Sequence, residues 1–141
     1  MFRKLGRFAP EILGLTRILV GVLLVCHGAQ KLFGAFGGTP PGTPAFIRWT
    51  AGGIELFGGA LLALGLLTRP VAFLTSGLMA FAYFMAHAPQ GFWPILNGGE
   101  LAIVYCWLAL SLAALGPGAW ALDNVLARED GLPAGALPGQ R

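Results

Sequence analysis

Long hydrophobic runs alternate along the chain with short segments rich in Gly, Pro and charged residues. A helix that crosses a bilayer needs about 20 mostly apolar residues, and clusters of Gly and Pro end helices. The pattern predicts membrane-spanning helices at about 11–33, 45–67, 70–88 and 98–115. We therefore expect an all-α protein in the form of a four-helix transmembrane bundle.

The segment after the fourth run differs from the spans because polar and apolar positions are mixed in it. Residues 119–128 predict a short interfacial helix that lies against the lipid. Its apolar positions are Trp120, Leu122, Val125 and Leu126. We take residues 1–128 as a single membrane domain and expect residues 129–141 to form a disordered tail.

Composition and charge exclude several classes of protein. The chain is 56% hydrophobic and 11% charged, whereas a soluble domain is roughly 25% charged. The net charge is +3, but the basic residues are scattered or lie at segment ends, so no face can follow the phosphate backbone of a nucleic acid. Cys26 and Cys106 form no CxxC pair and no metal-binding spacing, which excludes a disulfide scaffold and leaves open whether they pair.

Basic residues are distributed unequally between the two sides of the expected topology. One side carries Arg3, Lys4, Arg7, Arg69 and Arg128, and the other carries Lys31 and Arg48. Because cytoplasmic loops are enriched in Lys and Arg, both termini are expected on the cytoplasmic side of a bacterial-type inner membrane. Arg17 and Arg69 are expected to extend toward the inner lipid headgroups.

Polar residues within the spans gather toward the outer side. They are His27, Gln30, Lys31, Glu55, His87, Asn97 and Glu100. An ionised side chain at mid-membrane costs about 2.5 to 3.5 kcal/mol, so we expect these residues to face one another inside the bundle. His27 and Lys31 are four residues apart and share a helix face. The glycines of segment 52–59 are expected to let neighbouring helices approach closely around Glu55.

The two halves of the chain are similar at these positions. His27-Gly28-Ala29-Gln30 is matched by His87-Ala88-Pro89-Gln90, and Gly52-Gly53-Ile54-Glu55-Leu56 is matched by Gly98-Gly99-Glu100-Leu101 with one residue fewer. In a duplicated protein each half is a helical hairpin, and the hairpins are related by an axis along the membrane normal. Duplication and chance matching in a Gly-rich chain both remain open.

Taken together, these motifs resemble the DoxX family of small membrane proteins. The resemblance covers about residues 15–123. It rests on Arg17 with Gly21, segments 27–34, 53–59 and 65–69, His87 followed by Gly91-Phe92, segment 97–102, and Gly116-Pro117-Gly118 with Leu122-Asp123. The family often has a polar residue between the Gly-Pro-Gly turn and the Asp, where this chain has Ala119-Trp120-Ala121.

The resemblance implies a four-helix membrane bundle and a link to respiratory oxidoreduction, because namesake members look like subunits of a thiosulfate:quinone oxidoreductase. The chain has no Walker loop, dinucleotide fingerprint, flavin motif or haem motif, so electrons are expected to come from a diffusible quinone or a partner protein. Quinone is thus the suspected cofactor. Expected partners are the lipid bilayer, with soluble or membrane redox subunits and a homo-oligomer left open, and no nucleic acid.

Two functions agree with these observations, and whether the chain is an enzyme stays open between them. In a quinone-interacting oxidoreductase subunit, Glu55, Glu100 and His87 are the candidate catalytic groups. The candidate ligand-binding residues are His27, Gln30, Lys31 and Asn97, with ring contacts from Phe33, Phe57, Phe84 and Phe92. In a non-enzymatic membrane scaffold, small-molecule binder or carrier, the same cluster seals the bundle as an ion-pair network or holds a ligand. No metal site is predicted, although His and Glu are common metal ligands.

Overall fold

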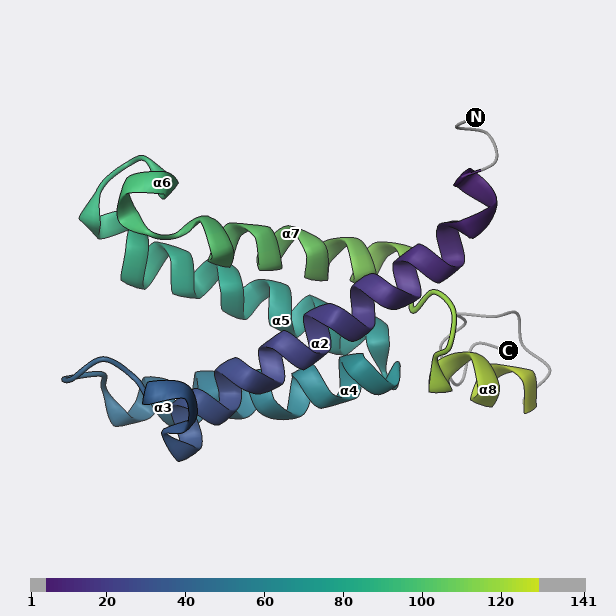
Figure 1. Cartoon of the computed structure of the whole chain (residues 1–141), viewed down its shortest axis with the longest axis horizontal. Coiled ribbons are helices and arrows are strands. Elements are labelled where there is room, and N and C mark those ends of the chain that lie inside the picture. The colour runs from purple at the N-terminus through teal and green to yellow at the C-terminus, as the bar shows by residue number, and fades with distance from the viewer. Residues whose placement is uncertain (1–4, 130–141) are drawn as a thin grey trace.

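The computed structural model describes residues 5–129. Within that range the chain is all-α, with 82% of residues helical and no strand. Four long helical stretches lie beside one another, and short turns and helices connect them (Figure 1). The stretches overlap the four segments expected from the hydrophobic runs.

The first stretch is α2, Ala9–Phe33, which follows the short helix η1, Gly6–Phe8. Pro10 lies in its first turn, where the missing N–H costs nothing because that group has no partner within the helix. The helix ends at Gly34, whose φ of 70° is the left-handed conformation that glycine adopts at helix C-termini. A short turn of helix, η2 (Ala35–Gly37), begins the loop that leads to the second stretch.

The second stretch contains a change of helix type. It runs through α3 (Ala45–Gly53), the π-helical segment η3 (Ile54–Gly58) and α4 (Gly59–Leu64) without a break. A π-helical turn accommodates an extra residue and is frequent at functional sites. Here it holds Glu55.

The second half of the chain forms another pair of stretches. The helix α5 (Thr68–Ala82) continues into the π-helical η4 (Tyr83–His87) and η5 (Ala88–Gln90). After α6 (Pro94–Asn97) the chain returns as α7 (Glu100–Leu115). The last element is α8 (Leu122–Glu129), which includes Glu129 from the expected tail; residues 130–141 lie outside the described residues.

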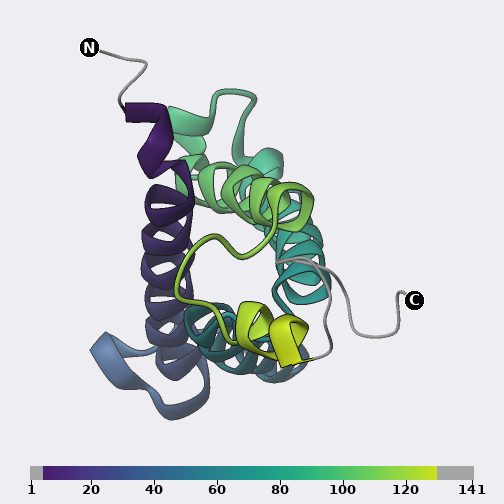
Figure 2. The same ribbon diagram turned by 90° about the vertical axis from the view of Figure 1, so that its right-hand side faces the viewer.

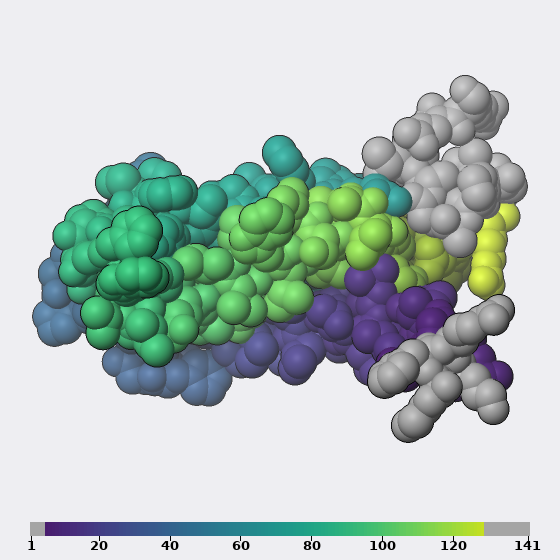
Figure 3. Space-filling model, turned by 90° about the horizontal axis from the view of Figure 1, so that it is seen from above, coloured from purple at the N-terminus to yellow at the C-terminus, as the bar shows by residue number. Residues whose placement is uncertain are grey.

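Each half is a helical hairpin. α2 packs along the α3–η3–α4 stretch, and α5 packs along α7, so the four stretches surround a common axis (Figure 2). Close packing in the first hairpin depends on glycine, as expected from segment 52–59. A Cβ added at Gly59 would lie 2.7 Å from the Gly21 carbonyl oxygen, which is closer than a Cβ and a carbonyl oxygen can approach. Figure 3 shows α7 between α2 and α5 on the upper surface.

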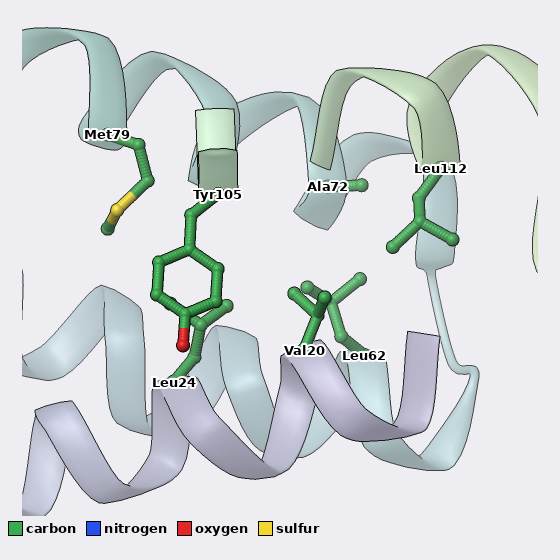
Figure 4. Close-up of a cluster of buried hydrophobic side chains, with 7 residues drawn as sticks. All are labelled: Val20, Leu24, Leu62, Ala72, Met79, Tyr105 and Leu112. Atoms are coloured by element: carbon green, nitrogen blue, oxygen red, sulfur yellow. The ribbon is translucent and has the colours of Figure 1, made fainter. Parts of the chain in front are cut away.

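The two hairpins diverge toward one end. They meet in a core formed by Val20, Leu24, Leu62, Ala72, Met79, Tyr105 and Leu112 (Figure 4). Toward the end that carries α3 and α6, the α2–α4 pair and the α5–α7 pair move apart (Figure 1). The described residues contain two helical stretches long and apolar enough to cross a membrane, Gly6–Phe33 and Thr68–Gln90, and α7 is a shorter apolar helix.

At the opposite end, Arg17 joins the hairpins, which corrects its expected place among lipid headgroups. Its side chain is completely buried. It donates hydrogen bonds to the carbonyl oxygens of Leu62, Ala63, Pro117, Ala119 and Trp120 at 2.6 to 3.0 Å. Leu62 and Ala63 lie in the last turn of α4, where carbonyls have no partner within the helix. Arg17 therefore caps α4 and fixes the segment before α8.

Two further residues hold this end together. The carboxylate of Asp123 on α8 accepts hydrogen bonds from the backbone N–H groups of Leu67 and Thr68, both at 2.8 Å, and so caps the start of α5. Arg69 is half-buried and donates to the carbonyls of Ala113 and Ala114 in the last turn of α7. Arg69 thus also caps a helix, which sequence analysis did not anticipate.

Candidate functional site

A cavity of about 460 Å³ lies where the hairpins diverge. Five of its lining residues have ionisable side chains: His27, Lys31, Glu55, His87 and Tyr105. The remaining walls are mostly apolar, including Leu24, Phe46, Ile47, Leu78, Met79, Phe81, Met85 and Leu101. A largely apolar cavity with a few convergent polar groups is the usual form of a small-molecule site.

The strongest polar contact in the cavity is an ion pair. Lys31 Nζ on α2 lies 2.6 Å from Glu55 Oε2 on η3. The Glu55 side chain is 6% exposed and that of Lys31 is 21% exposed, so the carboxylate is the more deeply placed partner. Because breaking a buried pair leaves one charge without compensation, this pair also holds α2 against η3. The structure thus brings together Lys31 and Glu55, as the sequence predicts.

The two histidines enter the cavity from different hairpins. His27 on α2 packs edge-on against the Tyr105 ring of α7, with ring centroids 6.0 Å apart. His87 ends η4, and its Nδ1 lies 2.9 Å from the Asn97 carbonyl oxygen. A carbonyl oxygen can only accept, so Nδ1 donates and Nε2 holds the lone pair of the neutral ring. In this tautomer Nε2 is the atom that can accept a hydrogen bond from a ligand; the sequence placed His87 among the candidate catalytic groups and could not indicate a tautomer.

Asn97 is close to the site but does not line the cavity. It is buried, and its side chain donates to the Gly91 carbonyl and accepts from the Gly99 N–H, both at 2.8 Å. The first bond ties α6 to the segment before it, the second orders the turn between α6 and α7, and the Asn97 carbonyl orients His87. In this structure Asn97 acts on the site through its backbone and through the turn.

Glu100 and Gln30 were expected among the converging polar residues, but neither lines the cavity. Glu100 is exposed in the first turn of α7, and Leu101 lines the cavity at that level instead. Glu100 shares the exposed face of α7 with Val104 and Trp107, whereas Ala102 and Tyr105 are buried on another face of the same helix. A carboxylate in that first turn is favoured by the positive end of the helix dipole. Gln30 is half-buried outside the cavity lining.

The expected aromatic contacts also differ. Phe33, Phe57, Phe84 and Phe92 are 67% to 82% exposed and point away from the cavity, while Phe46, Phe81 and Tyr105 line it. Sequence analysis missed Tyr105, whose ring extends from α7 toward α2 (Figure 4). The signal that the sequence offers is a phenolic hydroxyl in the middle of a mostly apolar helix, because a buried Tyr hydroxyl usually needs a partner.

The two cysteines form no disulfide and do not line the cavity. Cys26 and Cys106 are both free thiols, and Ser76 donates to the Cys106 carbonyl at 3.0 Å. Within residues 5–129, no three His, Cys, Asp or Glu side chains gather in a way that could hold a metal ion.

Two helical stretches of membrane-crossing length, and a buried ion pair between two of the helical segments, are features of a small helical membrane protein. The chain belongs to the DoxX family, whose profile matches residues 12–88. The family match runs from the first turns of α2 to the end of η4 and includes four of the five ionisable cavity residues.

Similar proteins extend over most of the chain. An uncharacterized protein of Haemophilus influenzae is 42% identical over 129 residues, which cover 86% of this chain and 95% of that protein. A second uncharacterized protein of the same organism is 36% identical over 84 residues, 59% of this chain and 56% of that protein. The inner membrane protein YqjF of Escherichia coli is 30% identical over 118 residues, 79% of this chain and 88% of that protein. No solved structure matches the chain significantly.

Proposed function

We propose that this membrane protein is a quinone-interacting subunit of an oxidoreductase linked to respiratory electron transfer, with the quinone ring bound in the cavity. The observation that carries the proposal is the cavity lining, which combines the Lys31–Glu55 ion pair and two histidines with apolar walls. A quinone ring needs an apolar slot and hydrogen-bond donors at its carbonyl oxygens. About 460 Å³ is within the range of small-molecule sites.

The polar residues have distinct roles in this proposal. Lys31 donates a hydrogen bond to a quinone carbonyl, and Glu55 keeps the ammonium in place. Reduction of a quinone adds two electrons and two protons; the electrons come from a redox partner subunit. Glu55, His27 and His87 exchange the protons, because carboxylate and imidazole groups are the usual general acids and bases of proteins. Glu100 takes no part in binding, because its side chain is exposed outside the cavity.

We further propose that all four helical stretches cross the bilayer and that the cavity opens in its outer half. Support comes from the ends of the bundle: the start of α2 lies at the same end as α8 (Figure 1). Arg7 and Arg128 belong to that end, and Lys31 and Arg48 to the other. The positive-inside rule then makes the α8 end cytoplasmic. Labelling of single cysteines in loop 38–44 and on α8 from opposite sides of the membrane tests this orientation.

One observation favours a second function. The Lys31–Glu55 pair joins two helices, so it can stabilise a scaffold or a small-molecule carrier that performs no chemistry. The two functions differ in their response to quinone, because a carrier or scaffold has no reason to prefer a redox-active ring.

The test is a titration of purified protein with a short-tail quinone and its quinol. We expect saturable binding to wild type that weakens about tenfold or more in the His27→Ala/His87→Ala double variant. The matched control is Gln30→Ala/Gln90→Ala, because these residues lie three positions after the histidines and outside the cavity lining. Absence of saturable binding to wild type, or equal loss in both double variants, would favour the carrier or scaffold.

A further inference from the structure

The cavity has an apolar side opening between the two hairpins. On one edge stand Phe46 and Thr50 of α3, and on the other Phe81 of α5 with Met85 and Ala86 of η4. All five side chains are exposed, Phe46 to 73%, Met85 to 60% and Phe81 to 53%. These residues therefore line the cavity and the outer surface of the bundle at once.

The opening exists because the hairpins do not close against each other at this level. The α5 helix packs against η3 and α4, deeper in the bundle, but α3 and η4 belong to the diverging ends (Figure 1). On the other side of the cavity, His27 and Tyr105 meet edge-to-face and join α2 to α7. The gap between α3 and η4 thus stays open while the gap between α2 and α7 is bridged.

Polarity changes along the cavity in a way that matches one kind of molecule. Glu55 is buried and pairs with Lys31 inside, while aromatic, Met and Ala side chains form the opening together with Thr50, whose hydroxyl donates to the Phe46 carbonyl of its own helix. A molecule with a polar ring and a hydrocarbon tail fits this order, with the ring inside and the tail in the opening. A charged group that approached through this side opening would have to pass a largely apolar edge, which is costly.

We infer that the ligand enters sideways from the lipid between α3 and η4 and leaves its hydrocarbon tail in that gap. This inference rests on the proposed function for the identity of the ring, but the route itself is a property of the opening. The substrate class is therefore a ring-headed, lipid-soluble amphiphile taken from the bilayer. A water-soluble metabolite taken from the outer aqueous side would use a different route.

The route can be measured without any quinone. A cysteine is placed at position 78, which lines the cavity on α5, in a Cys26→Ala/Cys106→Ala background reconstituted in liposomes. An uncharged maleimide that partitions into lipid should modify it, and a permanently charged thiosulfonate should react far more slowly than with a Pro41→Cys variant in the exposed loop. Equal reaction of the charged reagent at both positions would overturn the inference in favour of entry from water.

Blocking the opening gives the second arm of the test. Ala86→Trp should slow maleimide reaction at position 78 about tenfold, whereas Ala60→Trp, an exposed alanine of α4 outside the cavity, should leave it unchanged. Equal rates in the two tryptophan variants would overturn the route. Ala86→Trp should also weaken binding of a long-tail quinone more than that of its tail-less ring. If wild type binds neither quinone while the reagent results hold, the proposed quinone function fails and the lipid route stands.

Discussion

Arg17 and Pro117 are one hundred positions apart in the sequence, yet Arg17 Nε donates a hydrogen bond of 2.8 Å to the Pro117 carbonyl oxygen. The contact joins the first long helix to the segment that follows the last one. Because the same guanidinium also bonds two carbonyls of α4, it ties both hairpins together at the end remote from the cavity. The hairpins can then diverge at the other end without separating.

Replacing Arg17 should destabilise the whole bundle. Arg17→Gln removes most of the donors and leaves several buried carbonyls without partners, at an expected cost of about 3 kcal/mol or more. Thermal unfolding in detergent, followed by circular dichroism, measures the loss. Arg128→Gln is the control because that side chain is exposed at the same end, and its unfolding temperature should match wild type. Equal unfolding temperatures for both variants would contradict the capping role.

The ion pair predicts a specific pattern of stability. Glu55→Leu leaves Lys31 charged and unpaired, which should lower the free energy of unfolding by about 3 to 5 kcal/mol. Glu55→Gln should cost less because the amide oxygen still accepts from the ammonium. Adding Lys31→Met to Glu55→Leu should recover most of the loss. A double variant that is as unstable as the sum of the single variants would show that the two residues do not interact.

For Glu100, the structure and the sequence-based hypothesis predict different effects of a substitution. Since its side chain is exposed on α7, Glu100→Gln should leave both the unfolding temperature and quinone affinity at wild-type values. Glu55→Gln should retain the fold but lose proton exchange, and with it turnover in the assembled oxidoreductase. Calorimetric binding and a quinol oxidation assay report the two properties. Loss of binding in Glu100→Gln would restore this residue to the site.

Glycine at the crossing of α2 and α4 should be irreplaceable. Gly59→Ala forces a Cβ into the backbone of α2, so we expect a loss of about 1 to 3 kcal/mol. Gly77→Ala is a matched control, because it also lies within a helix but a Cβ there has open space around it. That substitution should raise stability by up to about 1 kcal/mol through helix propensity. Similar effects of both changes on thermal unfolding would argue against the close crossing.

Much of the fold was predictable because a helix needs only local information. Uninterrupted apolar runs and the Gly and Pro residues between them mark, within two positions, where α2, the stretch from α5 to η5, and α7 begin and end. The convergence of His27, Lys31, Glu55 and His87 was also predictable, since polar side chains in apolar helices have few alternatives to one another.

Other features depend on how the helices are turned about their axes. Four phenylalanines expected near the ring point outward, and Tyr105 points inward, because face assignment changes by about 100° with each residue and π-helical turns shift it further. Because segments 52–56 and 98–101 are similar, the sequence predicted that Glu100, like Glu55, faces the interior of the bundle. Glu100 lies on the face of α7 that also exposes Val104 and Trp107, so its side chain points outward.

The sequence by itself determined the class of protein, its helical segments and the convergence of His27, Lys31, Glu55 and His87, because hydropathy and the cost of lone charges act at every residue. Only the tertiary structure decided that Arg17 caps α4, that Asp123 caps α5 and that the cavity has an apolar side opening. These features come from backbone groups and helix faces that meet across long separations in the chain. Arg17 and Asp123 bind peptide carbonyl and N–H groups, and the opening is formed by exposed helix edges. The pattern of side chains along the sequence does not indicate which of these groups meet.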